Sequence, residues 1–462
     1  MKKALLNFTE IIAKLVNEES EKPIADHIPS ETLFQELDLS LPETPTTEDD
    51  FKTSLYELVR HTPKTGTNRF FNQLFGGRNE HAILGDLLSV FLNNSMYTYK
   101  AAGPQVGVEK VILNKVIEMI GWDASAGGTF ASGGSLTNFM SMLMARDRSQ
   151  GLIRSQGFRE SRLTVYTSRD SHYSIPKNAA FSGIGREQVR YIETDQKGRL
   201  IINELKQAIL NDIDKGYIPS LLNLTAGTTV LGSFDPIPEV AALCEEYDIW
   251  LHVDGAYCGS VLFSKKYKHL INGIEKVDSF SFNAHKMLST PLTCSLLIVK
   301  DKKHLYDSFS NEASYLYQTD HDEFNLGKTS LQCGRRNDAL KFWTLWKRVG
   351  TRGLETIVDW QFFLANCARE YVRSREDYTL YSFDESVSVC FNYKDIPARA
   401  LCTMLYEKSK LQVGYGSFKG TEFIRLVTVN ARNSKQDIFN FFKIIESFVK
   451  ENSEELLALQ TS

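Results

Sequence analysis

The sequence predicts an α/β protein with a mostly parallel sheet, preceded by a helical segment and followed by a small α+β domain. From about residue 110 to residue 300, helical stretches alternate with short runs rich in β-branched and aromatic residues. Strands that alternate with helices in this way are typical of a parallel sheet. After residue 350, a long helical stretch is followed by closely spaced strand-like runs, which indicates a second, smaller domain.

The N-terminal region differs from the rest of the chain. Residues 1–20 predict an amphipathic helix, not a signal peptide, because Thr9 and Glu10 interrupt the apolar run and no small-residue cleavage site follows. Residues 38–52 are acidic and rich in Pro and Thr, which predicts a loop or linker. We therefore expect a helical segment at 1–75, a large domain at 76–350 and a small domain at 351–462.

The remaining elements follow in order along the chain. In the large domain we expect helices at 108–122 and 136–149, and strands at 163–168, 189–194, 219–227, 249–255, 279–284 and 294–300. In the small domain we expect a helix at 353–374, strands at 378–383, 387–393 and 423–429, and a last helix at 434–450. These strand-like runs are short and rich in β-branched or aromatic residues.

The composition excludes several classes of protein. A chain of 462 residues suggests roughly two or three domains. The net charge of −4 gives no reason to expect a nucleic-acid partner or binding to an anionic membrane. No run approaches ~18 uninterrupted apolar residues, so we expect no membrane span. The seven cysteines, between Cys244 and Cys402, lack metal-type spacing; we expect free thiols, no metal and a cytoplasmic location.

The most informative pair of residues is Asp254 and Lys286, each at the end of an apolar strand. An enzyme that uses pyridoxal 5′-phosphate (PLP) needs a Lys amine to carry the cofactor as a Schiff base. It also needs a carboxylate to keep the pyridine nitrogen protonated. A surface lysine and a helix-capping carboxylate are the simpler explanation for either residue alone. Gly255 and Ala256 favour the cofactor, because a flat ring must lie against the backbone.

A glycine-rich turn at 131–135 opens the helix predicted at 136–149. The free N–H groups and the dipole at the start of a helix attract phosphate. Such a turn is also a common way to begin a helix, but with a Schiff-base lysine downstream we expect Gly134 and Ser135 to hold the cofactor's phosphate. On the lysine segment, we expect His285 to contact the phosphate and Ser279 to offer a hydroxyl group.

Two further residues follow predicted strands. His172 comes after strand 163–168, and Thr225 lies near the end of strand 219–227. We expect the His172 imidazole to stack over the cofactor ring and to orient the substrate carboxylate. Thr225 could hydrogen-bond the 3′ oxygen of the cofactor. Either residue taken alone is more often structural.

Together these stretches resemble the group II PLP-dependent amino-acid decarboxylases, in the glutamate and cysteine-sulfinate branch. The resembling motifs are FFNQLFGG (70–77), MYTYKAAGPQVGVE (96–109), GGSLTN (133–138), SHYSIPKNAAF (171–181), TAGTTVLGSFDPI (225–237), LHVDGAYCGS (251–260), FNAHKM (282–287), ASYLYQTD (313–320) and QCGRRNDALKFWTLWK (332–347). The resemblance implies fold type I with a seven-stranded sheet, and a domain-swapped homodimer with active sites at the subunit interface. The departures at Gly255, Tyr257 and Ala284 remove no functional group.

The resemblance also implies three roles toward the substrate. Tyr315, in ASYLYQTD, corresponds to the mobile-loop tyrosine that protonates Cα after CO2 leaves. Arg425, in EFIRLV, corresponds to the arginine that binds the distal acid group, for which a guanidinium fork is suited. Gln73 corresponds to a residue that lines the same pocket.

Phe75 bears on which acid is the substrate. The glutamate branch has a small Ser at this position, and a phenyl ring would shorten the pocket. We therefore favour decarboxylation of aspartate to β-alanine or of cysteine sulfinate to hypotaurine. One methylene is worth only ~1–3 kcal/mol of discrimination. A glutamate decarboxylase that makes γ-aminobutyrate stays open as an alternative.

Other activities fit the residues less well. A decarboxylase of neutral, aromatic or basic amino acids would have no use for Arg425, and a transaminase would need a different arrangement of arginines. A catalytically dead protein that only binds partners would not need Lys286, Asp254, His172 and Tyr315. We therefore expect an active decarboxylase.

Overall fold

The computed structural model describes residues 1–19, 24–158, 162–311, 317 and 321–458. The chain forms two compact units. The sheet unit comprises residues 78–363 and 385–387, and the terminal unit comprises residues 1–77, 364–384 and 388–462. The sequence predicted a separate segment at 1–75 and a boundary at residue 350. In the structure, residues 1–77 belong to the same unit as the C-terminal residues.

The boundary after residue 363 lies within α13 (Ala339–Arg373). Gly350 does interrupt this helix, with a backbone φ of 69°. The residues that follow nevertheless pack on the sheet unit: the Phe362 ring stacks on Tyr267 with centroids 3.8 Å apart. Asp359 also accepts a hydrogen bond from Ser264. These contacts explain why the helical break at Gly350 does not mark the boundary between the units.

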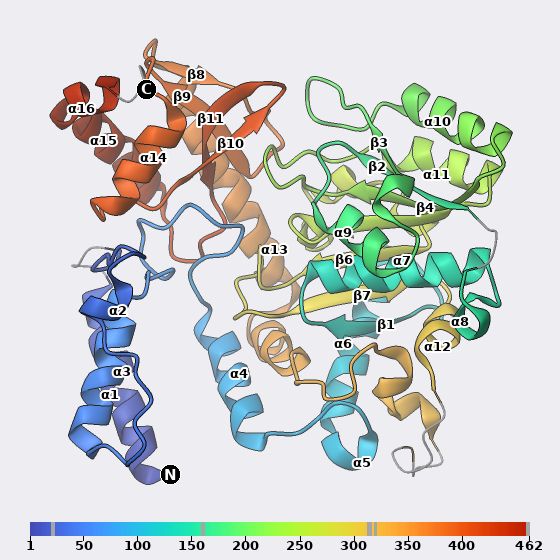
Figure 1. Cartoon of the computed structure of the whole chain (residues 1–462), viewed down its shortest axis with the longest axis horizontal. Coiled ribbons are helices and arrows are strands. Elements are labelled where there is room, and N and C mark those ends of the chain that lie inside the picture. The colour runs from blue at the N-terminus through green and yellow to red at the C-terminus, as the bar shows by residue number, and fades with distance from the viewer. Residues whose placement is uncertain (20–23, 159–161, 312–316, 318–320, 459–462) are drawn as a thin grey trace. The chain divides into compact units, whose positions relative to one another are not determined.

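The predicted α/β architecture is confirmed. The sheet unit contains one seven-stranded sheet, in the order β1-β7-β6-β5-β4-β2-β3. Strand β7 runs opposite to the other six strands, so its pairings with β1 and β6 are antiparallel and the remaining pairings are parallel (Figure 1). The strands are β1 Gly127–Ala131, β2 Leu163–Ser168, β3 Val189–Ile192, β4 Ile218–Thr225, β5 Trp250–Gly255, β6 Ser279–Asn283 and β7 Ser295–Val299. The sequence did not predict β1, because its glycines weaken the β-branched pattern that marks the other strands.

Helices of the sheet unit bury the strands. Helix α7 packs against β4, β5, β6 and β7 and against α9 and α12. Buried side chains from α7, such as Met140, meet Val165, Leu221, Trp250 and Leu297 of the strands. The helices that lie wholly in this unit are α4 Glu80–Leu92, α5 Tyr99–Ala102, α6 Gln105–Ile120, α7 Gly134–Ser149, α8 Ile153–Gln156, α9 Ser174–Phe181, α10 Ile202–Asp214, α11 Ile237–Glu246 and α12 Lys303–Phe309.

The terminal unit holds a four-stranded antiparallel sheet in the order β10-β11-β9-β8. Its strands are β8 Tyr378–Leu380, β9 Ser388–Tyr393, β10 Gly414–Phe418 and β11 Thr421–Val427. Its helices are α1 Lys2–Glu18, α2 Leu33–Glu36, α3 Glu48–His61, α14 Ala398–Glu407, α15 Lys435–Glu451 and α16 Ser453–Ala458, together with the end of α13. The sequence did not predict β10, whose two glycines give a weak strand signal.

The start of α3 differs from the prediction of a loop over 38–52. The Thr47 side chain accepts a hydrogen bond from the Asp50 backbone N–H and so caps the helix. Glu48, Asp49 and Asp50 occupy the first turn, where negative charge is stabilised by the helix dipole. The Thr and acidic residues that suggested a linker are therefore the N-terminal signature of a helix.

Two general expectations can be compared with the described residues. All seven cysteines are free thiols, and Cys333 alone among them is exposed. Among the helices that the structure describes, none has the length and hydropathy that crossing a membrane requires.

A buried ion pair ties β1 to the rest of the sheet unit. Arg335 and Glu109 of α6 pair with side chains 4% and 2% exposed, and Arg335 also donates to Thr129 Oγ1 at 2.8 Å. Removing one partner of a buried pair typically costs ~3–5 kcal/mol, because the other charge stays buried. We expect Glu109→Ala to lower the stability of the protein by that order, measured by chemical unfolding of the PLP-free protein.

Glu118→Ala on the same helix is the matched control. Glu118 pairs with Lys115 at the surface, with a side chain 69% exposed. Exposed pairs contribute about 0–1 kcal/mol. Equal losses for the two variants would contradict a stabilising role for the buried pair.

Candidate active site

The candidate site lies where the parallel strands of the sheet unit end. In a parallel sheet the carboxyl ends of neighbouring strands meet at one edge, and ligands bind there. Segments that follow β1, β2, β4, β5 and β6 enclose a cavity of about 220 Å³. Its lining residues are Gly134, Ser135, His172, Tyr173, Thr225, Gly227, Thr229, Asp254, Ala256, Tyr257, Asn283, His285 and Lys286.

Asp254 lies at the end of β5 and is only 4% exposed. Its Oδ1 accepts a hydrogen bond from the Ala256 backbone N–H at 2.9 Å, and its Oδ2 accepts one from Asn138 Nδ2 at 2.7 Å. Both donors stabilise the ionised form of the carboxylate. The carboxylate therefore faces the cavity as a fixed negative charge, which can hold a protonated ring nitrogen.

Lys286 and His285 follow β6 in a tight turn, in which the Lys286 backbone N–H donates to the Asn283 carbonyl at 3.1 Å. The Cys294 backbone N–H donates to His285 Nδ1 at 2.8 Å. Burial, assisted by the charge of Lys286, lowers the pKa of His285 to about 3. The imidazole is therefore neutral near pH 7. Nδ1 also lies 3.1 Å from the Cys294 carbonyl oxygen, but the contact with the N–H is the shorter one. With Nδ1 as the acceptor, the proton lies on Nε2, where it can donate to an anionic ligand.

The glycine-rich turn leads into α7, as predicted. The first amide groups of an α-helix have no partner within the helix, so they can bind phosphate. Gly134 must be a glycine here, because an added Cβ would lie 2.9 Å from the Cβ of Ala256 and 3.3 Å from Asn283 Nδ2. Gly255 is restricted in the same way, since a Cβ there would lie 2.6 Å from the Phe280 ring.

His172 lies beside the cavity in the loop after β2. Its Nδ1 lies 2.8 Å from Ser174 Oγ and accepts a hydrogen bond from the Ser174 backbone N–H at 3.2 Å. Burial lowers the pKa of His172; the nearby Asp254 raises it and Lys286 lowers it to a smaller extent. When the ring is neutral, its proton is therefore on Nε2. The adjacent Tyr173 ring, 4.3 Å away between centroids, was not singled out from the sequence.

Thr225 ends β4, and its backbone N–H donates to Asp235 Oδ2 at 2.8 Å. Its hydroxyl is buried, and no group among the described residues hydrogen-bonds it. Burial raises the pKa of Asp235 to about 7, although the N–H groups of Leu200 and Thr225 oppose that shift. The Asp235 carboxyl group thus holds the Thr225 backbone, and the Thr225 hydroxyl stays available to pair with a polar ligand at the cavity.

The structure does not bring Ser279 to the cavity. Ser279 lies at the start of β6, fully buried, and its Oγ lies 2.9 Å from each of Ser141 Oγ, Trp250 Nε1 and His252 Nδ1. Its hydroxyl therefore belongs to a hydrogen-bond network behind Asp254. The prediction placed it at the cofactor because it shares a strand with Lys286, but the strand carries it below the edge of the sheet.

The residues that line the cavity fit PLP. The lysine amine can bind the aldehyde carbon, Asp254 can pair with the ring nitrogen, and the start of α7 can receive the phosphate. The unpaired buried atoms among the described lining residues, Thr225 Oγ1 and Asn283 Oδ1, need a polar ligand. Within the described part of the chain, no group of three or more metal-ligating side chains is arranged to hold a metal ion.

The residues predicted to bind the substrate lie in the terminal unit. Arg425 is on β11, and its Nη2 donates to the backbone carbonyl of Asn72 at 3.0 Å. This contact brings Arg425 next to the segment that carries Gln73 and Phe75. Phe75 is half-buried, with its ring 6.3 Å from that of Phe70. Tyr315 lies outside the described residues.

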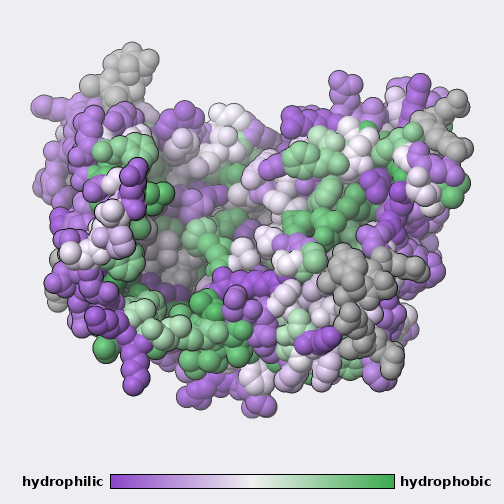
Figure 2. Space-filling view, turned by 60° about the horizontal axis from the view of Figure 1, so that its bottom comes forward, coloured by the Kyte–Doolittle hydropathy of each residue, from purple (hydrophilic) through white to green (hydrophobic). Residues whose placement is uncertain are grey.

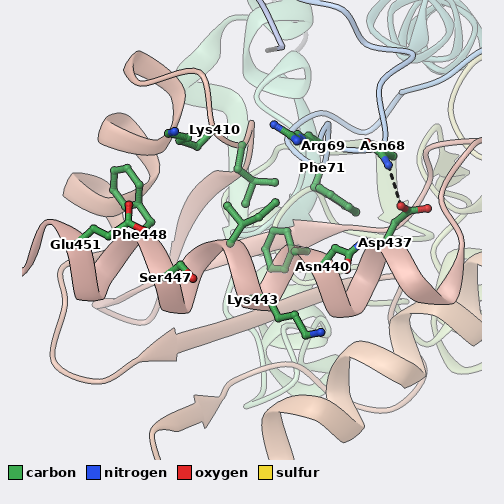
Figure 3. A pocket seen from close by; sticks show the side chains of 13 residues that line it. Asn68, Arg69, Phe71, Lys410, Asp437, Asn440, Lys443, Ser447, Phe448 and Glu451 are labelled. Carbon is green, nitrogen blue, oxygen red and sulfur yellow. Dashed lines mark hydrogen bonds between the residues drawn. The ribbon is translucent and has the colours of Figure 1, made fainter. Parts of the chain in front are cut away.

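The terminal unit has a cavity of its own, between the segment at 68–71 and helix α15 (Figure 3). Its volume is about 520 Å³, and a hydrogen bond from Asn68 Nδ2 to Asp437 Oδ1, 2.9 Å long, crosses one end. Its lining includes the basic residues Arg69, Lys410 and Lys443 and the acidic residues Asp437 and Glu451. This cavity contains none of the residues predicted to act on substrate or cofactor.

The sequence matches a family model described as the pyridoxal-dependent decarboxylase conserved domain, over residues 30–394. Among curated relatives, the acidic amino acid decarboxylase GADL1 of Mus musculus is 35% identical over 97% of this chain and 87% of the mouse protein. The cysteine sulfinic acid decarboxylase of Mus musculus is 37% identical over 88% of this chain and 87% of its own length.

Solved structures agree with this assignment. The crystal structure of mouse CSAD matches with a TM-score of 0.90 and 32% identity, over 96% of this chain and 98% of the mouse chain. Oryza sativa TDC, crystallised with PLP and tryptamine, matches with a TM-score of 0.90 at 23% identity, which shows the shared fold. It covers 97% of both chains.

We expect Gly134→Ala to weaken PLP binding, because the new methyl group must displace Ala256 or the Asn283 amide at the phosphate end of the site. Overpacking of this kind typically costs ~1–3 kcal/mol, about 5- to 150-fold in the dissociation constant. Titration of the PLP-free protein with PLP, followed by absorbance, measures the change.

Gly151→Ala provides the control for Gly134→Ala. Nothing lies within 4 Å of a Cβ at this exposed position, and its φ lies outside the left-handed region. The Gly151→Ala variant should bind PLP like the unmodified protein. Unchanged binding by Gly134→Ala would remove the start of α7 from the cofactor site.

Proposed function

The chain belongs to the pyridoxal-dependent decarboxylase family, and on this basis we propose that it removes the α-carboxylate of aspartate or cysteine sulfinate as CO2. The products are β-alanine and hypotaurine. The observation that carries the proposal is the cavity that joins Lys286, Asp254 and His172 to the start of a helix. When bound, PLP supplies an electron sink for the electron pair that CO2 leaves behind.

The residues assigned to cofactor and substrate have the following roles in this proposal. Lys286 holds the cofactor covalently until substrate displaces it, and Asp254 keeps the ring nitrogen protonated. His172 stacks on the ring, and its Nε2–H donates to the substrate carboxylate. Thr225 donates its hydroxyl to the cofactor's 3′ oxygen. His285 donates to the phosphate through Nε2–H. Tyr315 returns a proton to Cα after CO2 has left.

Substrate choice rests on the terminal unit. We assign binding of the distal acid group to Arg425, because its guanidinium can hold a carboxylate or sulfinate through paired hydrogen bonds. Gln73 and Phe75 belong to the segment that Arg425 contacts through Asn72. The Phe75 ring shortens the space for a side chain, which favours acids with one methylene. The printed names of the mouse relatives, acidic amino acid and cysteine sulfinic acid decarboxylase, support this class of substrate.

We further propose a cytoplasmic homodimer with shared active sites. The exposed surface supports an apolar interface: α4 alone exposes more than half of Leu84, Val90, Phe91 and Leu92. Figure 2 shows hydrophobic patches among hydrophilic residues on one face of the molecule. The segment at 1–75, which the structure groups with the C-terminal residues, forms part of the dimer interface in the same proposal.

The test is amine formation by the purified, PLP-loaded protein with aspartate, cysteine sulfinate and glutamate compared side by side. We expect product from the two shorter acids and less from glutamate. Lys286→Ala should abolish product formation and the absorbance of the bound cofactor. Turnover that survives this change would overturn the assignment of Lys286. Preference for glutamate would leave the assignment as a decarboxylase intact, but aspartate and cysteine sulfinate would no longer be the proposed substrates.

Two variants test the substrate residues in the same assay. Phe75→Ser should raise kcat/KM for glutamate relative to aspartate by roughly tenfold, since one methylene is worth ~1–3 kcal/mol. Arg425→Lys should lower kcat/KM for all acidic substrates, because an ammonium cannot form the paired hydrogen bonds.

Arg399→Lys is the control for Arg425→Lys. Arg399 lies in the same unit, with a side chain 67% exposed and paired with Glu422. This variant should keep the activity of the unmodified enzyme. If Arg425→Lys behaves like Arg399→Lys, then Arg425 has no contact with the substrate.

A further inference from the structure

A buried amide contacts Asp254 and is not among the residues that line the cavity. Asn138, on the second turn of α7, is 1% exposed. Its Nδ2 donates to Asp254 Oδ2 at 2.7 Å and to Ser174 Oγ at 3.1 Å. Its Oδ1 lies 3.1 Å from Nε2 of His252, a fully buried residue two positions before Asp254 on β5.

The donors and acceptors of this network fit together in only one arrangement. An ionised Asp254 can only accept, so Asn138 must turn its NH2 group toward it. The Asn138 oxygen then faces His252, which must carry its proton on Nε2. His252 Nδ1 is left as an acceptor, and the Ser279 hydroxyl donates to it at 2.9 Å.

The groups at the Ser279 end of the network also have hydrogen-bond partners. Indole N–H groups only donate, so Ser279 Oγ accepts from Trp250 Nε1 at 2.9 Å. Ser141 Oγ, also 2.9 Å from Ser279 Oγ, can donate its own proton to it, which leaves the Ser279 proton for His252. Burial lowers the pKa of His252 to about 4, so the ring stays neutral and keeps a single N–H. The opposite tautomer would place two acceptors face to face, either His252 against Asn138 or Asn138 against Asp254.

We propose that Asn138, oriented by His252, is a positioning residue that keeps the Asp254 carboxylate ionised and aligned with the cofactor's ring nitrogen. This inference rests on the PLP site proposed above. His252 and Ser279 act through Asn138 and do not touch the cofactor. Their role is to fix which end of the Asn138 amide faces Asp254.

The same amide reaches His172 through Ser174. Because Asn138 Nδ2 donates to Ser174 Oγ, the Ser174 hydroxyl is left to donate to His172 Nδ1 at 2.8 Å. One side chain therefore orients the carboxylate at the ring nitrogen and the imidazole proposed to stack on the ring.

The test compares binding of PLP with binding of its 1-deaza analogue, in which carbon replaces the ring nitrogen. The PLP-free protein is titrated with each compound, and the ratio of the two dissociation constants measures the contact with the nitrogen. A hydrogen bond to a charged group is worth about tenfold to a hundredfold in affinity. Asn138→Leu should shrink the preference for PLP by that factor.

Two variants of His252 provide a conservative pair. Gln places an N–H close to the position of Nε2, so His252→Gln should keep the preference for PLP. Asn is too short to reach Asn138, so His252→Asn should lose the preference although it is equally polar. If Asn138→Leu does not fold, this pair still decides the proposal.

Asn178→Leu is the matched control. Asn178 is 4% exposed and donates to the Ser135 carbonyl at the start of α7, at 2.9 Å. Replacing Asn178 should weaken the binding of PLP and of the 1-deaza analogue equally. The ratio of the two dissociation constants should therefore stay unchanged. If the Asn138 and His252 variants also weaken the binding of both compounds equally, then the role of Asn138 and His252 is only structural and the proposal is wrong. If Asp254→Ala leaves the ratio unchanged, the proposed cofactor site itself is wrong.

Discussion

The buried carboxylate of Asp254 is the constraint on which the site in the sheet unit depends. A charge taken out of water costs several kcal/mol unless hydrogen bonds compensate for it. Here the Ala256 N–H and the Asn138 amide provide that compensation, while the carboxylate stays turned toward the cavity. An ionised group held this way can keep a pyridine nitrogen protonated without rearranging. In the proposed site, the Asp254 carboxylate thus keeps the cofactor ring able to withdraw electrons, because the fold holds the carboxylate in place.

Helix α7 connects the two ends of this site. Its first residue, Gly134, lies at the edge of the cavity where the helix dipole attracts phosphate. Asn138, four residues later and therefore on the same face of the helix, reaches Asp254. In the proposed site, one rigid element therefore fixes both the phosphate end and the nitrogen end of a flat cofactor. Packing of α7 against β4, β5, β6 and β7 holds this spacing.

Local sequence patterns account for most of the fold. The strands β2 to β7 are short apolar runs, most of them separated by helices, and each was predicted near its observed position. Two strands escaped prediction: β1 and β10 each contain two glycines, and their strand conformation depends on neighbours far away in the chain. The start of α3 was misinterpreted because Thr and Asp serve both loops and helix caps. A single sequence does not distinguish these two uses.

The sequence by itself determined which residue types stand at the strand ends, and from them it predicted the chemistry. Lys286, Asp254 and Gly134 each stand in a short motif whose residue types match one task. Only the tertiary structure decided which polar residues touch the cavity and which support it. Ser279 and His252 are paired by the register of β5 and β6, and they reach Asp254 through Asn138, more than a hundred residues earlier in the chain. The tertiary structure also decided that residues 1–77 belong to one unit with the C-terminal residues. Both depend on packing between distant segments, and the spacing of residues along a chain carries no record of that packing.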